Sequence, residues 1–200
     1  MNKYSLKFVP VKPKDDKKID QIYEATLKLV NEKGLAGITM SEIAKEAGLA
    51  TGTLYIYFKS KDELVNALFA FCRKASAEVY FKNYDPAKPF KIGFKTIWLN
   101  LLKYRIDKFQ QAVFVDQCYH SPYITESNKE ITKKLFQPLY KLVERGKAER
   151  LLKNIDNFLL LTHMVGTINE VVKHTHYNGK PLTKNMIRQM FNMCWDGIKE

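Results

Sequence analysis

Apolar residues recur at helical spacing along almost the whole chain, and this pattern constrains the fold more than any other feature. One stripe runs from Ile19 to Val30 at a spacing of 3.6 residues and is followed by Gly34. A second stripe runs from Leu64 to Val79, after a Ser-Lys-Asp-Glu sequence at 60–63 that is typical of a helix start. The period-two alternation that indicates strands is almost absent. The sequence therefore predicts an all-α protein.

Further helices are expected at 88–104, 106–119, 124–147, 155–175 and 183–198, which gives about nine in total, with a kink at Pro138. The last two helices carry large apolar residues around much of their circumference. Such helices form either an internal core pair or a two-fold interface, in which two helices from each protomer make a four-helix bundle. We expect the second arrangement, a homodimer through the helices at about 155–175 and 183–198.

The chain is strongly basic, with 33 Lys and Arg against 21 Asp and Glu and a net charge of +12. This excess favours an anionic partner: nucleic acid, an acidic membrane surface or an anionic ligand. Residues 1–64 have a net charge of only +2, whereas residues 65–200 carry +10. Within the first part, residues 1–18 carry +4, so a basic arm is expected over 1–17. Net charge therefore cannot locate a nucleic-acid interface.

Three separated cysteines, Cys72, Cys118 and Cys194, form neither a disulfide framework nor a zinc motif, and we expect buried thiols in a reducing cytosol. His174 and His176 are two residues apart and do not share a helix face, so no metal and no cofactor is expected. The most apolar segment, Phe158 to Val172, is too short and too polar to span a bilayer. The N-terminus lacks a signal-peptide pattern. A cytoplasmic protein without membrane contact is expected.

Four of the nine glycines fall within residues 34–52, where the sequence predicts two short helices. Thr39 to Glu42 forms a capping-box pattern, so a helix is expected from there to Ala47, ended by Gly48. Thr51 is expected to N-cap a second helix that runs to about Phe58. This spacing is typical of a helix-turn-helix.

The side chains of this segment agree with a DNA-binding role. Ala44 is small where the two helices must cross, whereas Ile43, Ala47, Leu49 and Leu54 are apolar where the pair packs on the first helix. On the second helix we expect an outward face of hydroxyl groups and one glycine, made by Thr51, Gly52, Thr53, Tyr55 and Tyr57. Gly52 permits close approach to a DNA backbone, and hydroxyl groups bind phosphate oxygens or base edges.

The segment ITMSEIAKEAGLATGTLYIYFKSKDELVNALF resembles the DNA-binding domain of the TetR family of bacterial transcriptional repressors. The similarity covers about Lys18 to Phe71 and includes T-x-x-x-I-A-x-x-A-G, then G-T-L-Y-x-Y-F, then K-x-x-L. It implies a three-helix domain over 18–64, with phosphate contacts from Thr39, Ser41 and Lys61. The family often has Ser and then Lys before G-T-L-Y, whereas this chain has Ala50 and Thr51, so phosphate contact there is expected to be weaker or shifted.

The same resemblance implies that residues 65–200 form a helical effector-binding and dimerisation domain. Candidate pocket residues are aromatic or polar side chains on its helices, although such residues more often belong to a core. These candidates are Phe94, Trp98, Tyr104, Phe114, Gln117, Tyr119, Tyr123, Phe136 and His163. For His163 we expect a hydrogen-bonded core position in preference to a place in the pocket.

The sequence favours a ligand-responsive repressor that binds a DNA palindrome as a homodimer and is released by a small molecule. No G-x-S-x-G elbow, phosphate-binding glycine loop or H-E-x-x-H motif is present, so an enzyme is not expected. Two alternatives stay open at this point. One is a non-specific architectural DNA-binding protein, and the other is a dimeric helical small-molecule-binding module that does not bind DNA.

Overall fold

The computed structural model describes residues 16–119 and 121–200, so the expected basic arm lies almost entirely outside the described residues. Ten helices form in the described residues, with no strand beyond an isolated bridge between Leu152 and Lys199. The all-α prediction is confirmed. The chain divides into two compact units, the first ending at Leu64 and the second running from Val65 to Glu200.

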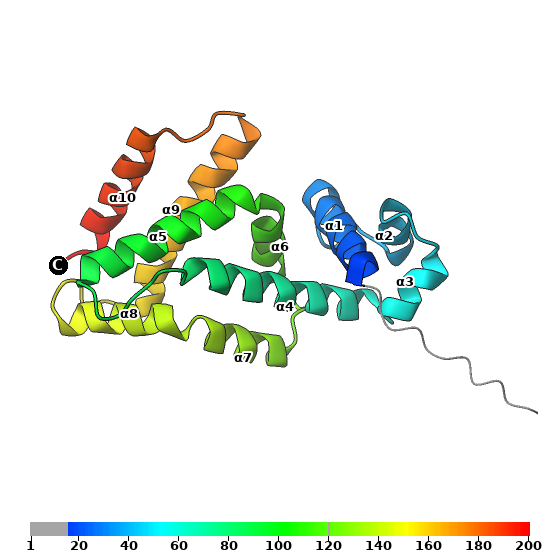
Figure 1. Ribbon diagram of the computed structural model, residues 1–200, viewed down its shortest axis with the longest axis horizontal. Helices are drawn as coiled ribbons and strands as arrows, with labels where there is room; N and C mark the ends of the chain where they lie inside the picture. The colour runs from blue at the N-terminus through cyan, green and yellow to red at the C-terminus, as the bar shows by residue number, and fades with distance from the viewer. Residues whose placement is uncertain (1–15, 120) are drawn as a thin grey trace, which may run out of the picture. The chain divides into compact units, whose positions relative to one another are not determined.

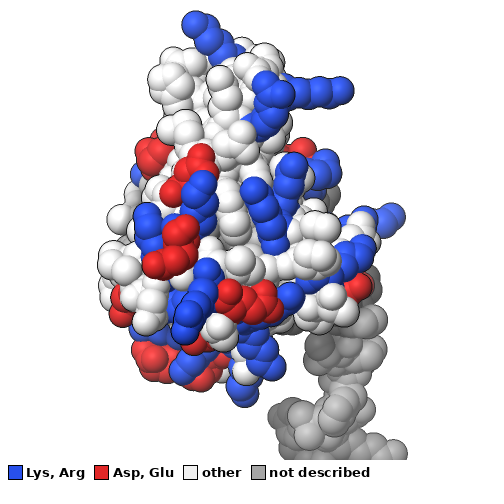
Figure 2. All heavy atoms as spheres, turned by 90° about the vertical axis from the view of Figure 1, so that its left-hand side faces the viewer, with Lys and Arg blue, Asp and Glu red and all other residues white. Residues whose placement is uncertain are grey.

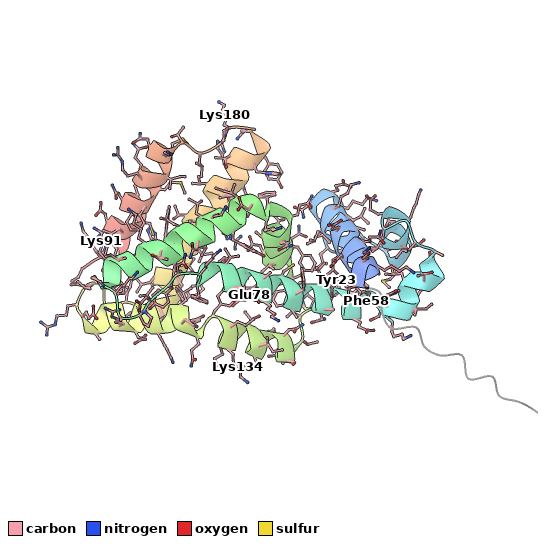
Figure 3. The ribbon with its side chains drawn as sticks, in the orientation of Figure 1. Tyr23, Phe58, Glu78, Lys91, Lys134 and Lys180 are labelled. Carbon is pink, nitrogen blue, oxygen red and sulfur yellow. The ribbon has the colours of Figure 1, made fainter. Side chains whose placement is uncertain are left out.

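The first unit contains three helices: α1 (Asp16–Lys33), α2 (Met40–Glu46) and α3 (Thr51–Tyr57). The apolar stripe of α1 buries Ile22 and Val30 completely, and Ile43 of α2 and Leu54 of α3 are equally buried. Tyr23 of α1 packs beside Phe58, which follows α3, with ring centroids 6.0 Å apart (Figure 3). Three amphipathic helices thus share one small core.

The second unit is larger and entirely helical (Figure 1). Its first helix, α4, begins four residues before the unit boundary. The helices are α4 (Lys61–Tyr80), α5 (Phe90–Asp107), α6 (Phe109–Tyr119), α7 (Glu126–Leu135), α8 (Gln137–Ala148), α9 (Asn157–Tyr177) and α10 (Lys184–Ile198).

Helix α5 provides the centre of this second core. It contacts α6, α8 and α9, and α9 in turn contacts α10. Trp98 of α5 is fully buried and meets Phe191 of α10 edge to face, with ring centroids 5.4 Å apart. The buried residues of α5 recur at three- and four-residue spacing from Phe90 to Leu102 and form one broad face, whereas Ile92 and Ile106 on the other side are exposed.

The expected helix at 124–147 is two helices, which is why the structure has ten helices in its described residues and not about nine. Phe136 ends α7 and precedes α8, and Pro138 lies at the start of α8. Proline has no backbone N–H to donate to the carbonyl of Lys134, and its ring clashes with that carbonyl. The helix therefore breaks where only a kink was expected.

All three cysteines are buried and free, as expected. Burial raises the pKa of the Cys72 thiol to about 12 and that of Cys194 to about 11, so both are uncharged at neutral pH. Within the described ranges, no helix combines the length and the apolar character needed to cross a bilayer.

Candidate nucleic-acid interface and ligand cavity

Helix α2 begins at a complete capping box, as the sequence predicts. The backbone N–H of Glu42 donates to Oγ1 of Thr39 at 3.3 Å, and the backbone N–H of Thr39 donates to Oε2 of Glu42 at 2.9 Å. Lys33 of α1 forms an ion pair with the same carboxylate at 2.8 Å. The hydrogen bonds from Lys33 and Thr39 lower the pKa of Glu42 to about 2. These contacts hold the start of α2 against the end of α1.

The turn between α2 and α3 is a Schellman motif centred on Gly48. Its φ of +68° suits glycine, its N–H donates to Lys45 O at 3.1 Å, and the N–H of Leu49 donates to Ala44 O at 2.8 Å. Ala44 itself is fully buried. The carbonyl groups at the end of α2 are thereby satisfied, and the chain is turned directly into α3 at the predicted spacing.

The N-cap of α3 is Ala50 and not Thr51, so that expectation is wrong. Ala50 is extended, with φ −67° and ψ 142°, and no side chain caps the helix. Thr51 is the first helical residue and is exposed. Its hydroxyl is therefore not used as the cap.

Most of the predicted DNA-contacting residues lie on the surface of the first unit. Thr39, Ser41, Thr51 and Gly52 are exposed, Thr53 is half-buried, and Tyr55 is 44% exposed. Two further residues on the same helices, which residue type did not single out, are also exposed: Lys45 of α2, and Ile56 of α3 at 65%. Ile56 follows Gly52 by four residues, so helical spacing places both on one face.

Tyr57 does not lie on this outward face, which corrects the sequence prediction. It is only 8% exposed, and it follows fully buried Leu54 by three residues on the same side of α3. Lys61 is half-buried, and its ammonium group donates to Ile38 O at 2.9 Å and to Ala36 O at 3.5 Å. In this structure the Lys61 charge lies against the loop before α2.

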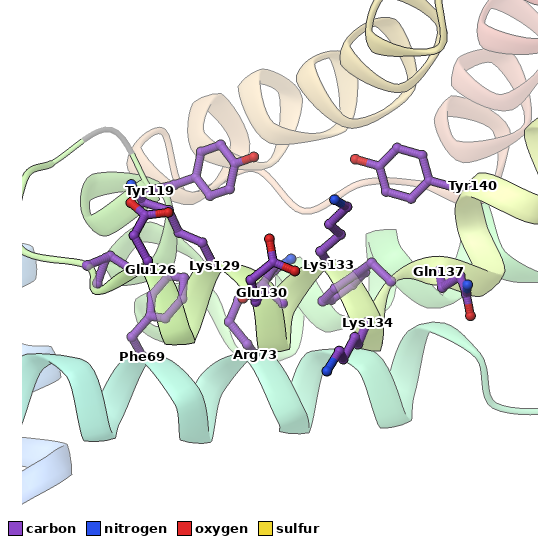
Figure 4. Close-up of a pocket in the computed structure, with 13 residues that line it drawn as sticks. Phe69, Arg73, Tyr119, Glu126, Lys129, Glu130, Lys133, Lys134, Gln137 and Tyr140 are labelled. Atoms are coloured by element: carbon purple, nitrogen blue, oxygen red, sulfur yellow. Dashed lines mark hydrogen bonds and ion pairs between the residues drawn. The ribbon is translucent and has the colours of Figure 1, made fainter.

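The second unit contains a cavity of about 880 Å³ between the side chains of α4, the end of α6, α7 and the start of α8. Phe69 and Arg73 come from α4, and Thr132 comes from α7. Tyr119 and Tyr140 line it from opposite ends, with their hydroxyl groups turned toward each other (Figure 4). A volume of this size is within the range of small-molecule sites.

The predicted pocket residues separate into three groups. Only Tyr119 and Phe136 line this cavity. Four others are buried core residues that do not line it: Phe94, Trp98, Tyr104 and Phe114. Gln117, Tyr123 and His163 are also absent from its walls, and His163 is exposed beside Gly197 of α10, so it is not a core residue. The lysines of α7 and Arg73 of α4 also line the cavity but were not among the predicted pocket residues.

Two family models match the chain. The model for bacterial regulatory proteins of the tetR family matches residues 22–68, and the model for the tetracyclin repressor-like C-terminal domain matches residues 89–199. The first covers the helix-turn-helix, and the second covers more than half of the chain, including the helices of the second unit from α5 onward.

Known proteins agree with this match. An uncharacterised HTH-type transcriptional regulator of Haemophilus influenzae is 37% identical over 82 residues, which cover 41% of this chain and 44% of that protein. The matched segment thus spans less than half of this curated relative. A TetR-family regulator from Marinobacter aquaeolei VT8 superposes with a TM-score of 0.84 at 26% identity, covering 95% of this chain and 100% of that one.

FadR of Bacillus subtilis superposes with a TM-score of 0.63 at 19% identity, over 88% of this chain and 95% of that one, and shares the fold alone. The helix-turn-helix geometry, the helical second unit and the two matching models together identify this chain as a member of the TetR family of bacterial regulatory proteins.

Proposed function

We propose that the chain is a transcriptional regulator, in the simplest case a repressor, that binds palindromic operator DNA as a homodimer and is released by a small-molecule effector. It would act in the cytoplasm, where bacterial DNA is. The observation that carries the proposal is the exposed polar face of α2 and α3 on a helix-turn-helix whose turn and capping box are both formed.

The DNA-facing surface is proposed to consist of Thr39, the N-cap of α2, of Ser41 on α2, and of Thr51, Gly52, Thr53 and Tyr55 on α3. The hydroxyl groups would bind phosphates and base edges, and Gly52 would let the backbone of α3 approach the duplex. A Cβ atom placed on Gly52 meets no atom of the protein within 4 Å, so packing within the protein does not require glycine there. Lys61 would reach a phosphate only by leaving its carbonyl partners.

The homodimer is proposed to form through α9 and α10. These helices expose large apolar side chains that a stable fold normally buries: Phe158 and Met193 are each 70% exposed, Leu159 is 54% exposed, and Met186 is 41% exposed. Burial in an isologous interface would remove this apolar surface from water. A two-fold dimer would also place two reading helices about 34–36 Å apart, one turn of DNA.

The effector site is proposed to be the cavity beside α4 and α7. FadR of Bacillus subtilis was crystallised in complex with stearoyl-CoA, so this fold can accept an acyl thioester. Helix α4 continues from the cavity wall at Arg73 back to Lys61 in the first unit, so an effector that displaces α4 would act on both units. A coupling of about 1–3 kcal/mol is enough to release a marginally held operator.

The direct test is selection of bound duplexes from a random pool with the purified protein. A palindromic consensus with two half-sites one helical turn apart is expected. The Thr53→Ala/Tyr55→Ala double variant should then lose the selected site while keeping the wild-type melting temperature. Thr96→Ala, which removes a hydroxyl that donates to Ile92 O in the second unit, should bind like the wild type.

Each alternative predicts a different result. A non-specific architectural protein would retain every duplex equally and yield no consensus, and a binding module without DNA affinity would retain none. If the Thr53→Ala/Tyr55→Ala variant still selects the same consensus, residues other than Thr53 and Tyr55 recognise the operator.

A further inference from the structure

A cation without a counter-ion lines the cavity of the second unit. Arg73 of α4 is half-buried, with its guanidinium 3.9 Å from the centroid of the Phe136 ring. Its Nε is buried without a hydrogen-bond partner, and no ion pair with this guanidinium forms among residues 16–119 and 121–200. Burial lowers the pKa of Arg73. Because arginine stays charged in proteins, a guanidinium that is buried beside an aromatic ring without a carboxylate partner favours the binding of an anion.

A second unsatisfied polar group lies on the facing wall. The Oγ1 atom of Thr132, on α7, is buried and has no hydrogen-bond partner, and Thr132 lines the same cavity as Arg73. A hydroxyl can donate to a carboxylate or phosphate oxygen. Two residues from different helices that line one cavity therefore each carry a buried polar atom without a hydrogen-bond partner.

The rest of the wall is apolar deep in the cavity and positively charged at its rim. Phe69, Ile124 and Phe136 are buried apolar residues of the wall. Lys129, Lys133 and Lys134 of α7 are exposed around it, and Lys134 points away from α7 in Figure 3.

Two carboxylates, Glu126 and Glu130, also line the rim of the cavity (Figure 4). Glu126 forms an ion pair with Lys129 at 2.6 Å, and Glu130 is exposed. With Arg73 and the three lysines the lining has four cations against two anions, so the surroundings favour a negatively charged ligand.

From these observations we propose that the cavity binds an amphipathic molecule with one anionic headgroup, a carboxylate or a monophosphate. The headgroup would lie on Arg73 and Thr132, and the hydrocarbon part would pack on Phe69, Ile124 and Phe136. This proposal rests on the proposed effector site and specifies the ligand class that it recognises. Arg73 is then the specificity-determining residue, because a guanidinium pairs with an oxyanion in a bidentate geometry.

The test compares four decyl compounds that differ only in the headgroup, each below its critical micelle concentration and titrated into the wild-type protein by calorimetry. We expect decanoate or decyl phosphate to bind at least tenfold more tightly than 1-decanol, and decylammonium to bind weakest. The tighter of the two anions identifies the headgroup. Equal affinity for decanol and both anions, or no binding by either anion, would overturn the proposal.

Variants locate the headgroup. Arg73→Gln should reduce the affinity for the preferred anion at least tenfold and leave the affinity for decanol unchanged, whereas Arg73→Lys should retain part of the preference. Arg150→Gln removes the same charge from an exposed residue that does not line the cavity and should bind like the wild type. An unchanged anion preference in a folded Arg73→Gln protein would contradict the assignment.

The measurement is made on the free protein, so its outcome is independent of DNA binding. An anion that binds through Arg73 without releasing the selected operator would support the ligand class and contradict the proposed regulation. Release of the operator by decanol as efficiently as by the anions would support the proposed regulation and contradict the ligand class.

Discussion

Gly52 lies in the first turn of α3, on the exposed face proposed to approach DNA. Because a Cβ atom there meets nothing within 4 Å, Gly52→Ala should raise helix stability by up to about 1 kcal/mol, since alanine favours the helix. The same methyl group should lower the affinity for the selected operator by blocking close approach. Melting temperature and operator affinity are measured on the same variant, so reduced affinity in a more stable protein cannot result from unfolding. Unchanged affinity would show that the backbone of α3 stays away from the duplex.

Glu42 gives a pH-dependent prediction. Its pKa falls from 4.5 to about 2 in the folded protein, first through the hydrogen bond from Lys33 and then through those from Thr39. Its ionised form therefore contributes stability that is fully present above pH 4.5 and is lost as the pH falls toward 2. The stability difference between the wild type and Glu42→Gln, measured by urea unfolding, should shrink across this window. If the difference in unfolding free energy between the wild type and Glu42→Gln stays constant from pH 6 to pH 2.5, the ionised Glu42 carboxylate does not stabilise the fold.

The outcome at Tyr57 shows what residue type alone can and cannot predict. Its hydroxyl and its place in the G-T-L-Y-x-Y-F block favoured an outward position, yet the three-residue spacing from Leu54 already places both on the buried face. Thr51 is a similar case, because a threonine favours an N-cap, but after the Schellman turn the N-cap lies one residue earlier, at Ala50. Backbone geometry decided both positions over side-chain preference.

Buried Tyr57 yields its own prediction. Tyr57→Ala should destabilise the first unit by about 3–5 kcal/mol through lost burial and a residual cavity, whereas Tyr55→Ala should change stability by less than about 1 kcal/mol. Thermal unfolding followed by circular dichroism distinguishes the two variants. Equal losses of stability would contradict the different burial of the two tyrosines.

At the scale of elements, the side chain of Asn66 connects α4 to the segment before α7. Its Nδ2 donates to Tyr123 O at 2.8 Å, and its Oδ1 accepts from the N–H of Thr125 at 3.0 Å and from Nδ2 of Asn128 at 2.9 Å. Asn66→Ala should cost about 1–3 kcal/mol of unfolding free energy because the partners lose these bonds. It should also speed hydrogen exchange at the Thr125 amide.

The matched control is Asn185→Ala at an exposed residue of α10, whose side-chain oxygen accepts a hydrogen bond from Arg188 at 2.8 Å. It should change stability by less than about 0.5 kcal/mol. An equally small effect of Asn66→Ala would mean that the side-chain hydrogen bonds of Asn66 contribute little to stability.

Most helices could be predicted from apolar spacing, proline and glycine, because these signals are local. The α7–α8 break exceeded the expected kink because Pro138 removes a donor and also clashes with the preceding turn. The cavity could not be predicted, since Arg73 and Thr132 are far apart in sequence and come to line one cavity only through the packing of their helices. From the sequence alone, an arginine in an amphipathic helix is expected to lie on the solvent-exposed face. Only the structure shows that Arg73 is half-buried and forms no ion pair with the described residues.

At the scale of the molecule, the charge excess of residues 65–200 is distributed over surface that also carries acids. On the face drawn in Figure 2, Lys and Arg side chains alternate with Asp and Glu instead of forming one uniform patch. Several lysines are paired in exposed contacts, for example Lys103 with Asp107 at 2.5 Å and Lys199 with Asp196 at 2.7 Å. These pairs are exposed and contribute little stability, so the charges that form them lie on solvated surface.

The apolar faces of α9 and α10 provide the last prediction. Phe158 and Met193 are each 70% exposed, so replacing them with glutamate should leave the packing of the second unit intact. In a dimer that buries these faces, the double variant Phe158→Glu/Met193→Glu would place four carboxylates in an apolar interface, where their desolvation is unfavourable. Sedimentation at micromolar concentration should therefore show a wild-type dimer and a monomeric variant.

Loss of the dimer should also weaken binding to the full palindrome while leaving binding to an isolated half-site unchanged, because the proposed DNA-facing surface lies in the first unit. Ile131→Glu on α7, at a residue that is 44% exposed, adds a carboxylate outside the proposed interface and should remain dimeric. A double variant that still sediments as a dimer would exclude α9 and α10 as the contact. The exposed apolar face would then need another partner, because a patch of this kind is seldom left in water.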